Sequence, residues 1–147
     1  MALSIRPVSI LDIDDLVRLV EGYRAFYKQE PNTQTKEYLV DRILGGQVVA
    51  FIAQLESRAI GFTMIYPTYS TVSLTRIWLL NDLFVDFNYR GQGIANALVQ
   101  AAETAAKEAG ASRIWLRTAE DNVIAQRLYE SRGWVQDKVF RRYDLIF

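Results

Sequence analysis

The stretch from Leu83 to Ala95 reads LFVDFNYRGQGIA and joins an apolar strand to a long Ala- and Leu-rich helix through a short turn. Small residues at 91, 93 and 95 let the main chain approach a ligand closely. The helix that follows points unpaired N–H groups and the positive end of its dipole at this turn. Arg90 adds a positive charge. The stretch therefore predicts a site that binds a pyrophosphate.

Two ligand classes use such a turn. A dinucleotide site needs Gly-x-Gly-x-x-Gly/Ala, and here Asn96 occupies the third small position. An acid does follow at Glu120, after a strand-like segment, so spacing alone leaves this alternative open. The template Gln/Arg-x-x-Gly-x-Gly/Ala is met by Arg90, Gly93 and Ala95. It resembles the acyl-CoA pyrophosphate loop of the GCN5-related N-acetyltransferase (GNAT) superfamily.

A second stretch, Glu120 to Trp134, reads EDNVIAQRLYESRGW. It is similar to the second GNAT signature, Asn-x-x-Ala-x-x-x-Tyr-Glu-x-x-Gly-Phe, with Trp134 in place of the usual Phe. Asn122 suits a helix N-cap, and Ala125 and Tyr129 then share one helix face. The resemblance implies that Asn122 holds the pantetheine arm and that the Tyr129 hydroxyl lies near the CoA sulfur. The two signatures in this order favour the acyl-CoA interpretation.

Composition narrows the chemistry. The 147 residues suit one domain, 1–147, and Lys+Arg and Asp+Glu both number 17, so the net charge does not attract nucleic acid or an anionic membrane. There is no histidine and no cysteine, which excludes Ser-His triads, thiol nucleophiles and the commonest metal ligands. Proton transfer then falls to carboxylate, Tyr, Lys or water. We expect no metal, and a cytoplasmic protein without a leader or membrane span.

Hydrophobic periodicity and turn residues predict an α/β fold with a mixed sheet. We expect strands at 3–8, 48–55, 59–66, 74–85 and 112–118, helices at about 13–28, 35–44, 91–109 and 122–132, and one or two final strands within 134–147. Ser9 and Asp12 form a capping-box pattern. The order β-α-α-β-β-β-α-β-α-β is that of the GNAT fold, and the resemblance covers nearly the whole chain.

The acceptor side resembles two groups within the family. Segments 61–69 and 79–85 look like diamine and polyamine N-acetyltransferases, and segments 119–132 and 140–143 resemble the yeast Hpa2-like group. In the polyamine enzymes the positions of Asn81 and Asp82 carry Glu-Asp, and the Glu is the usual candidate base. Asn81 departs from that pattern because it cannot take a proton. Asp82 either attracts the acceptor ammonium and relays its proton through water, or is satisfied by neighbouring backbone or Arg.

The resemblance implies acetyl-CoA as cosubstrate. We expect acetyl-CoA to bind Leu83, Phe84, Val85, Arg90, Gly91, Gln92, Gly93, Ile94, Ala95, Asn122, Ala125, Tyr129 and Arg132. Tyr129, as proton donor to the departing thiolate, and Asp82 are the expected catalytic residues, and Tyr27, Asn81 and Asp82 are the expected acceptor-binding residues. Since no Cys can carry the acetyl group, the amine would attack directly, with a main-chain N–H near Val85 polarising the thioester.

The expected activity is acetylation of a primary amine: a small amine, a polyamine, an amino acid or a lysine-like acceptor. The rival from another class is a non-catalytic acyl-CoA-binding module, against which Tyr129 argues. The segment 134–147 mixes aromatic and β-branched residues with charges, which suits strands that meet a partner. Because both acetyltransferase groups pair through their C-terminal halves, we expect a homodimer with two-fold symmetry.

Overall fold

The computed structural model describes residues 2–147. The chain divides into two compact units, and the boundary in the sequence lies between Leu116 and Arg117. The first unit holds β1 (Leu3–Pro7), a 3-10 turn (Ile10–Asp12), α1 (Ile13–Phe26), α2 (Thr35–Leu44), β2 (Val49–Leu55), β3 (Arg58–Ser70), β4 (Thr75–Val85), a second 3-10 turn (Phe87–Tyr89), α3 (Ile94–Glu108) and β5 (Arg113–Trp115). The second unit, Arg117–Phe147, holds α4 (Val123–Ser131). The α/β class is confirmed, and so is the predicted order of the elements from β1 to α4. No helix of residues 2–147 is long and apolar enough to cross a membrane.

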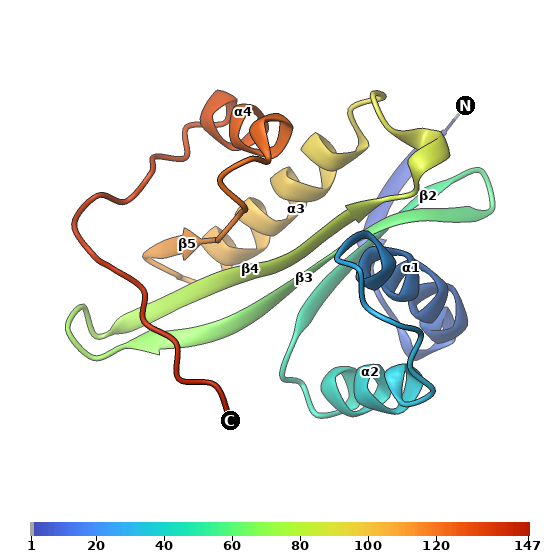
Figure 1. The fold of residues 1–147 in the computed structure, drawn as a ribbon, viewed down its shortest axis with the longest axis horizontal. Coiled ribbons are helices and arrows are strands. Elements are labelled where there is room, and N and C mark those ends of the chain that lie inside the picture. Colours follow the sequence, from blue (N-terminus) through green and yellow to red (C-terminus); the bar gives the residue numbers. More distant parts are fainter. Residues whose placement is uncertain (1) are drawn as a thin grey trace. The chain divides into compact units, whose positions relative to one another are not determined.

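A five-stranded mixed sheet, in the order β1-β2-β3-β4-β5, forms the centre of the first unit (Figure 1). Neighbouring strands are antiparallel, except that β4 and β5 run parallel. The parallel pairing joins just Ile77–Leu79 to Arg113–Trp115. Beyond Leu79, no strand within residues 2–147 pairs with the outer edge of β4. This open edge lies at the end of β4 that leads into the glycine turn.

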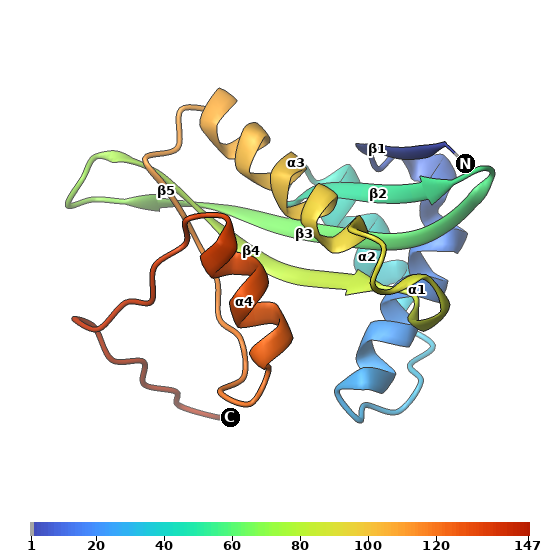
Figure 2. The same ribbon diagram turned by 90° about the horizontal axis from the view of Figure 1, so that it is seen from above.

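The sheet is buried on both faces, because helices cover each of them (Figures 1 and 2). α1 and α2 pack on one face, where Leu16, Leu39 and Phe62 belong to one apolar cluster. α3 packs on the other face, where Leu98 and Ile60 belong to a second cluster. Strands buried on two faces read as continuous apolar runs, which is the pattern of β2 and β3. The two clusters fix which side of β4 each of its side chains faces.

The first helix begins as its sequence predicts. Ser9 and Asp12 form the capping box that precedes α1. Arg6 of β1 donates two hydrogen bonds to the Asp12 carboxylate, at 2.8 and 2.7 Å. This ion pair, helped by the Ser9 N–H, lowers the pKa of Asp12 to about 2. Asp12 therefore ties β1 to the start of α1.

β3 is longer than the sequence predicts. It runs through Pro67 to Ser70, a stretch that we expected to begin a loop. Proline cannot donate a ladder hydrogen bond, so it is confined to strand edges. Pairing of β2 to β3 ends at Val49↔Ile65, and beyond that point β3 has β4 as its one neighbour in the described residues. Pro67 is tolerated because it lies on this edge.

The final strands expected within residues 134–147 do not form. That segment carries no regular secondary structure. Its backbone uses a local alternative: the N–H groups of Val139 and Phe140 donate to the Asp137 carboxylate, at 2.9 and 3.4 Å. An Asp side chain that binds nearby backbone competes with strand ladders and favours a turn. The apolar residues of the segment remain exposed, at Val135, Val139, Phe140, Tyr143, Leu145, Ile146 and Phe147.

Candidate active site

A β-bulge in β4 places the expected acceptor residues. In the register with β3, Met64 opposes Asp82 and Ile65 opposes Leu80, so Asn81 is an extra residue. Because side chains alternate along a strand, the extra residue turns Asp82 to the face that Met64 shares with α1 and α2. Without the bulge, Asp82 would follow Leu80 to the α3 face. The bulge therefore decides what Asp82 can contact.

Asp82 is a partly buried carboxylate with neutral partners. The Asn81 side chain donates to its two oxygens at 3.1 Å each. The Tyr23 hydroxyl donates to the Asn81 carbonyl at 3.5 Å and also faces the Asp82 carboxylate. Burial raises the pKa of Asp82, although the Asn81 and Tyr23 contacts favour its charged form. No described Arg or Lys forms an ion pair with Asp82, so the structure does not support the alternative in which an Arg satisfies it.

Asp82 opens into a cavity of about 350 Å³ between α1, the start of α2, and strands β3 and β4. We call it the tyrosine cavity. Its lining residues are Val20, Tyr23, Arg24, Asn32, Gln34, Thr35, Tyr38, Leu39, Phe62, Met64, Tyr66, Asn81 and Asp82. A cavity of this volume is at the lower end of the range for small-molecule sites, about 300–1,000 Å³.

Tyrosines dominate the walls of this cavity. Tyr23 packs edge-on against Phe62, with ring centroids 5.7 Å apart. Burial, with the neighbouring charge of Asp82, raises the pKa of Tyr23, so its hydroxyl stays protonated. On the other side, the hydroxyls of Tyr38 and Tyr66 lie 3.5 Å apart, and burial likewise raises the pKa of Tyr66. The phenols can therefore donate hydrogen bonds without adding negative charge.

The rim toward α2 is held by a second polar group. The Glu21 carboxylate accepts from the Thr35 hydroxyl and, at 3.3 Å, from the Asn32 N–H. Arg24 donates to Glu21 at 3.2 Å and to the Glu30 carbonyl at 2.7 Å. The Thr35, Asn32 and Arg24 contacts lower the pKa of Glu21. These bonds fix the connection between α1 and α2 at the mouth of the cavity.

Of the three acceptor residues expected from sequence, Asn81 and Asp82 line the tyrosine cavity and Tyr27 does not. Tyr27 is half-exposed at the end of α1 and packs its ring against Tyr23, with centroids 5.1 Å apart. The i, i+4 spacing predicts that Tyr23 and Tyr27 share one helix face. Tyr27 lies one turn further along, at the end of α1, and so does not reach the cavity. Tyr38 and Tyr66 were missed, and no local pattern distinguishes them from core aromatics.

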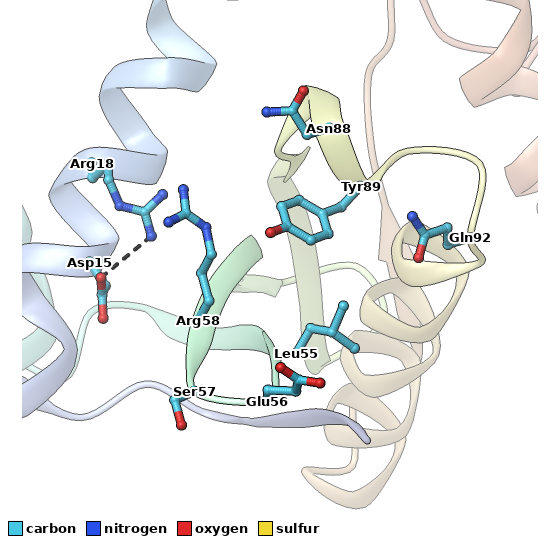
Figure 3. A pocket seen from close by; sticks show the side chains of 9 residues that line it. All are labelled: Asp15, Arg18, Leu55, Glu56, Ser57, Arg58, Asn88, Tyr89 and Gln92. Atoms are coloured by element: carbon cyan, nitrogen blue, oxygen red, sulfur yellow. Dashed lines mark hydrogen bonds and ion pairs between the residues drawn. The ribbon is translucent and has the colours of Figure 1, made fainter. Parts of the chain in front are cut away.

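A second and larger cavity, of about 640 Å³, lies at the β2–β3 turn, and we call it the hairpin cavity. Figure 3 shows Arg18 of α1 and Arg58 of β3 extending toward one another there, with the Tyr89 hydroxyl turned toward Arg58. Arg18 pairs with Asp15 at 3.4 Å, and its guanidinium also donates to the Ala59 carbonyl at 2.8 Å. Arg58 lies 3.9 Å from Asp86. Each arginine thus has an acidic partner.

The glycine turn has the conformation that its residues predict. Gly91 and Gly93 have φ of +75° and +80°, which L side chains rarely adopt, and a Cβ at either would meet nothing within 4 Å. Gly93 is the N-cap of α3 and has no side chain to satisfy the first-turn N–H groups. Exposed Arg90 stands beside the turn. Open space, unsatisfied donors and positive charge meet the requirements of an anion site.

Arg90 also ties the turn to the open edge of β4. Its Nε donates to the Val85 carbonyl at 3.0 Å, and its guanidinium lies 5.5–5.7 Å from the ring centroids of Phe26, Phe84 and Phe87. The Asp86 N–H bonds to Ile60 of β3, so by alternation the Val85 N–H points the other way, from the open edge. A ligand along that edge can meet this donor.

The other residues predicted to bind acetyl-CoA lie on both faces of the sheet in the first unit and in the second unit. Val85 and Ile94 belong to the cluster under α3, and Leu83 and Ala95 pack against it, whereas the Phe84 ring packs toward Tyr23. Exposed Gln92 lines the hairpin cavity.

Ala125, Tyr129 and Arg132 belong to the second unit, where Asn122 is the N-cap of α4 as expected. Its Oδ1 accepts from the Ala125 N–H at 3.2 Å. Tyr129 is buried in α4 and packs against Trp134, with ring centroids 5.6 Å apart. The main-chain N–H of Trp134 donates to the Tyr129 carbonyl at 3.0 Å, past Gly133, whose φ is +90°. This αL glycine closes the helix.

Comparison with known proteins identifies the family. The chain matches the model of the Acetyltransferase (GNAT) family over residues 16–134. It is 38% identical over 144 residues to the N-acetyltransferase YhfO of Bacillus subtilis, covering 97% of each chain. It is 29% identical to a probable acetyltransferase of Haemophilus influenzae, covering 91% of each.

Solved structures agree with these matches. The crystal structure of a probable acetyltransferase superposes with a TM-score of 0.93 at 33% identity, covering 98% of this chain and 97% of that one. A ribosomal-protein-alanine N-acetyltransferase from Brucella melitensis shares the fold, with a TM-score of 0.85 at 23% identity, covering 99% and 100%. The open choice between a dinucleotide and an acyl-CoA turn is thereby decided for acyl-CoA. The chain belongs to the GNAT family and is an acyl-CoA-dependent N-acetyltransferase.

Proposed function

We propose that the protein transfers an acetyl group from acetyl-CoA to a primary amine bound in the tyrosine cavity, with the amine nitrogen at Asp82. One observation carries the proposal: the bulge at Asn81 turns a carboxylate without a cationic partner into a cavity of small-molecule size. A buried titratable group with a shifted pKa inside a cleft is a marker of function.

Asp82 supplies the first proton transfer. A free amine has a pKa near that of Lys, about 10.4, so it arrives as an ammonium ion. The carboxylate attracts this ion and accepts its proton, directly or through one water. The raised pKa of Asp82 makes it a stronger base than an exposed aspartate.

The transfer itself needs no covalent enzyme intermediate. The amine nitrogen attacks the thioester carbonyl carbon, a C–N bond forms, and the C–S bond breaks. The Val85 N–H, directed out of the open edge of β4, would stabilise the carbonyl oxygen as charge develops on it. The second amine proton goes to water, because Asp82 already holds the first, and the CoA thiolate takes a proton from a general acid.

Tyr129 is the proposed general acid. The CoA thiolate resembles a Cys thiolate, with a pKa of roughly 8.5, and a phenol with a pKa near 10 can donate to it as it forms. The pyrophosphate of acetyl-CoA would bind the Gly91–Gly93 turn, the first N–H groups of α3 and Arg90.

The experiment is turnover against a panel of primary amines. CoA release is followed with a thiol reagent, which meets no protein thiol because the chain has no cysteine. The acetylated product is identified by mass spectrometry. Tyr129→Phe should lower kcat by about 10²–10⁴-fold, the usual contribution of general acid catalysis, with little change in acetyl-CoA affinity. Binding of acetyl-CoA without amine-dependent CoA release would disprove the proposal.

We also propose that two copies assemble through residues 134–147. The support is the row of exposed apolar side chains on that segment, from Val135 to Phe147. Light scattering at micromolar concentration should give twice the 16.9 kDa chain mass. A chain-mass particle that keeps full activity on dilution would exclude a required dimer.

A further inference from the structure

The charges around the tyrosine cavity are few and unequal. Its charged lining residues are Asp82 and Arg24. Arg24 is compensated by Glu21, at 3.2 Å, and by the Glu30 carbonyl. Asp82 has neutral partners, Asn81 and Tyr23. The cavity therefore presents a single uncompensated negative charge.

The remaining wall is apolar and aromatic. Phe62, Leu39 and Met64 are buried core residues that reach the cavity, and Tyr23 and Tyr66 face it with protonated phenols. Such a wall favours an alkyl or aryl group of the ligand. Its aromatic faces can also attract the ammonium group of that ligand. It offers no described carboxylate that could neutralise a second ammonium.

A positive charge behind the wall acts against a second ammonium. The Arg42 guanidinium stacks on the Tyr38 ring, 4.8 Å from its centroid, and its Nε is buried without a hydrogen-bond partner. Its charge reaches Tyr66, where it opposes the burial-driven rise in the pKa of that phenol. Arg42 thus adds a positive charge on the α2 side of the cavity, although at Tyr66 its effect is smaller than that of Asp82.

Resting on the proposed function, we infer that the acceptor is a monoammonium compound with an uncharged alkyl or aryl body, and that a polyamine or an amino acid with a free carboxylate is a poor substrate. A second ammonium would lose its water without gaining a counter-ion. A free α-carboxylate would be brought close to Asp82, a like charge. The uncharged body could belong to a small amine or to the amino terminus of a peptide.

Two matched pairs test the charge rule. Hexylamine and 1,6-diaminohexane differ by one ammonium, and phenylalaninamide and phenylalanine differ by one carboxylate at nearly constant shape. We expect kcat/KM to be at least about tenfold higher for the first member of each pair, since one unpaired charge is lost in each case. Adding 2-phenylethylamine separates a small amine from the peptide-like phenylalaninamide, because it lacks the amide.

A cavity variant should move the diamine preference. Gln34→Glu adds a carboxylate to the lining, and we expect it to raise the ratio of kcat/KM for 1,6-diaminohexane over hexylamine. Gln100→Glu, which adds the same charge at an exposed position of α3 outside the cavity lining, is the matched control and should leave the ratio as it is.

The outcomes distinguish this inference from the function on which it rests. Turnover that favours 1,6-diaminohexane or phenylalanine would overturn the inference and leave amine acetylation in place. Absence of turnover with every amine, while acetyl-CoA still binds, would overturn both.

Discussion

The tyrosine cavity and the hairpin cavity differ in how their charged side chains are paired. The hairpin cavity is larger, about 640 against 350 Å³. Its arginines, Arg18 and Arg58, have the acidic partners Asp15 and Asp86, and both side chains are well exposed to solvent. Asp82 in the tyrosine cavity has no cationic partner and a raised pKa. A charged side chain without a partner in the fold can form an ion pair with a ligand. A surface charge that is already paired gains little from a ligand.

The largest expected difference between the cavities is in turnover. Asp82→Asn removes the proton acceptor but keeps an oxygen for the Asn81 amide, so kcat/KM for the amine should fall by about 10²–10⁴-fold. Asp15→Asn removes one of the two carboxylates that line the hairpin cavity and should change kcat/KM little. Steady-state kinetics on both variants makes the comparison. Equal losses would mean that the charge contrast does not mark the active site.

The next largest expected effect is on acetyl-CoA affinity, which should differ between substitutions of Arg90 at the glycine turn and Arg58 in the hairpin cavity. Arg90→Ala removes a charge at the glycine turn and its bond to the Val85 carbonyl, so the acetyl-CoA Kd should rise by roughly 10–100-fold, or about 1.5–3 kcal/mol. Arg58→Ala acts on a charge already near Asp86 and should leave the Kd nearly unchanged. Calorimetry measures both, with circular dichroism to show that the fold is kept. An unchanged Kd in Arg90→Ala would contradict the pyrophosphate assignment.

The dependence of kcat/KM on pH should reflect the ionisation of Asp82. The carboxylate must be ionised to take a proton, and its pKa is raised by burial, so the acid limb of kcat/KM should lie above the ordinary aspartate value of about 3.9. Below that limb, activity should fall about tenfold per pH unit. The limb should disappear in the residual activity of Asp82→Asn. A limb at the same pH in both proteins would assign it to another group.

The smallest expected effect is on stability, and it should have opposite signs for Asp12→Asn and Asp82→Asn. The pKa of Asp12 is lowered, so its pair with Arg6 stabilises the fold above about pH 4, and this gain is lost as pH falls toward 2. Asp12→Asn should therefore lower the free energy of unfolding at pH 7 by about 1–2 kcal/mol. The pKa of Asp82 is raised, so its charge costs stability at pH 7 and Asp82→Asn should raise Tm. Thermal unfolding at pH 7 and pH 3 tests both signs, and a fall in Tm for Asp82→Asn would contradict the second.

Local features were accessible from the sequence. The glycine turn, the Ser9–Asp12 capping box and the Asn122 N-cap all form as predicted, because each depends on backbone conformation and hydrogen bonds within a few residues. The first four strands and all four helices lie within a few residues of their predicted bounds, apart from the extension of β3 through Pro67. Hydrophobic periodicity reports these elements directly.

The residues that line the tyrosine cavity could be predicted only in part. The sequence pointed to Asn81 and Asp82, which line it, but also to Tyr27, whereas Tyr23 lines the cavity, and Tyr38 and Tyr66 were missed. These residues come from α1, α2 and β3, and no short pattern connects them. The strands predicted within residues 134–147 do not form for a related reason. Aromatic and β-branched residues indicate that a segment can pair, but the N–H groups of Val139 and Phe140 bond instead to the Asp137 carboxylate.

By itself, the sequence determined the family, the conformation of the glycine turn and the order of the elements up to α4, since these follow from contiguous residues whose conformational preferences agree. The tertiary structure decided which face Asp82 occupies. One extra residue in β4, Asn81, changes the alternation of the strand, and a change of one residue moves every following side chain to the opposite face. That register is set by pairing with β3 and by the helices packed on each side. The placement of the Asp82 carboxylate in the cavity is therefore a property of the assembled sheet.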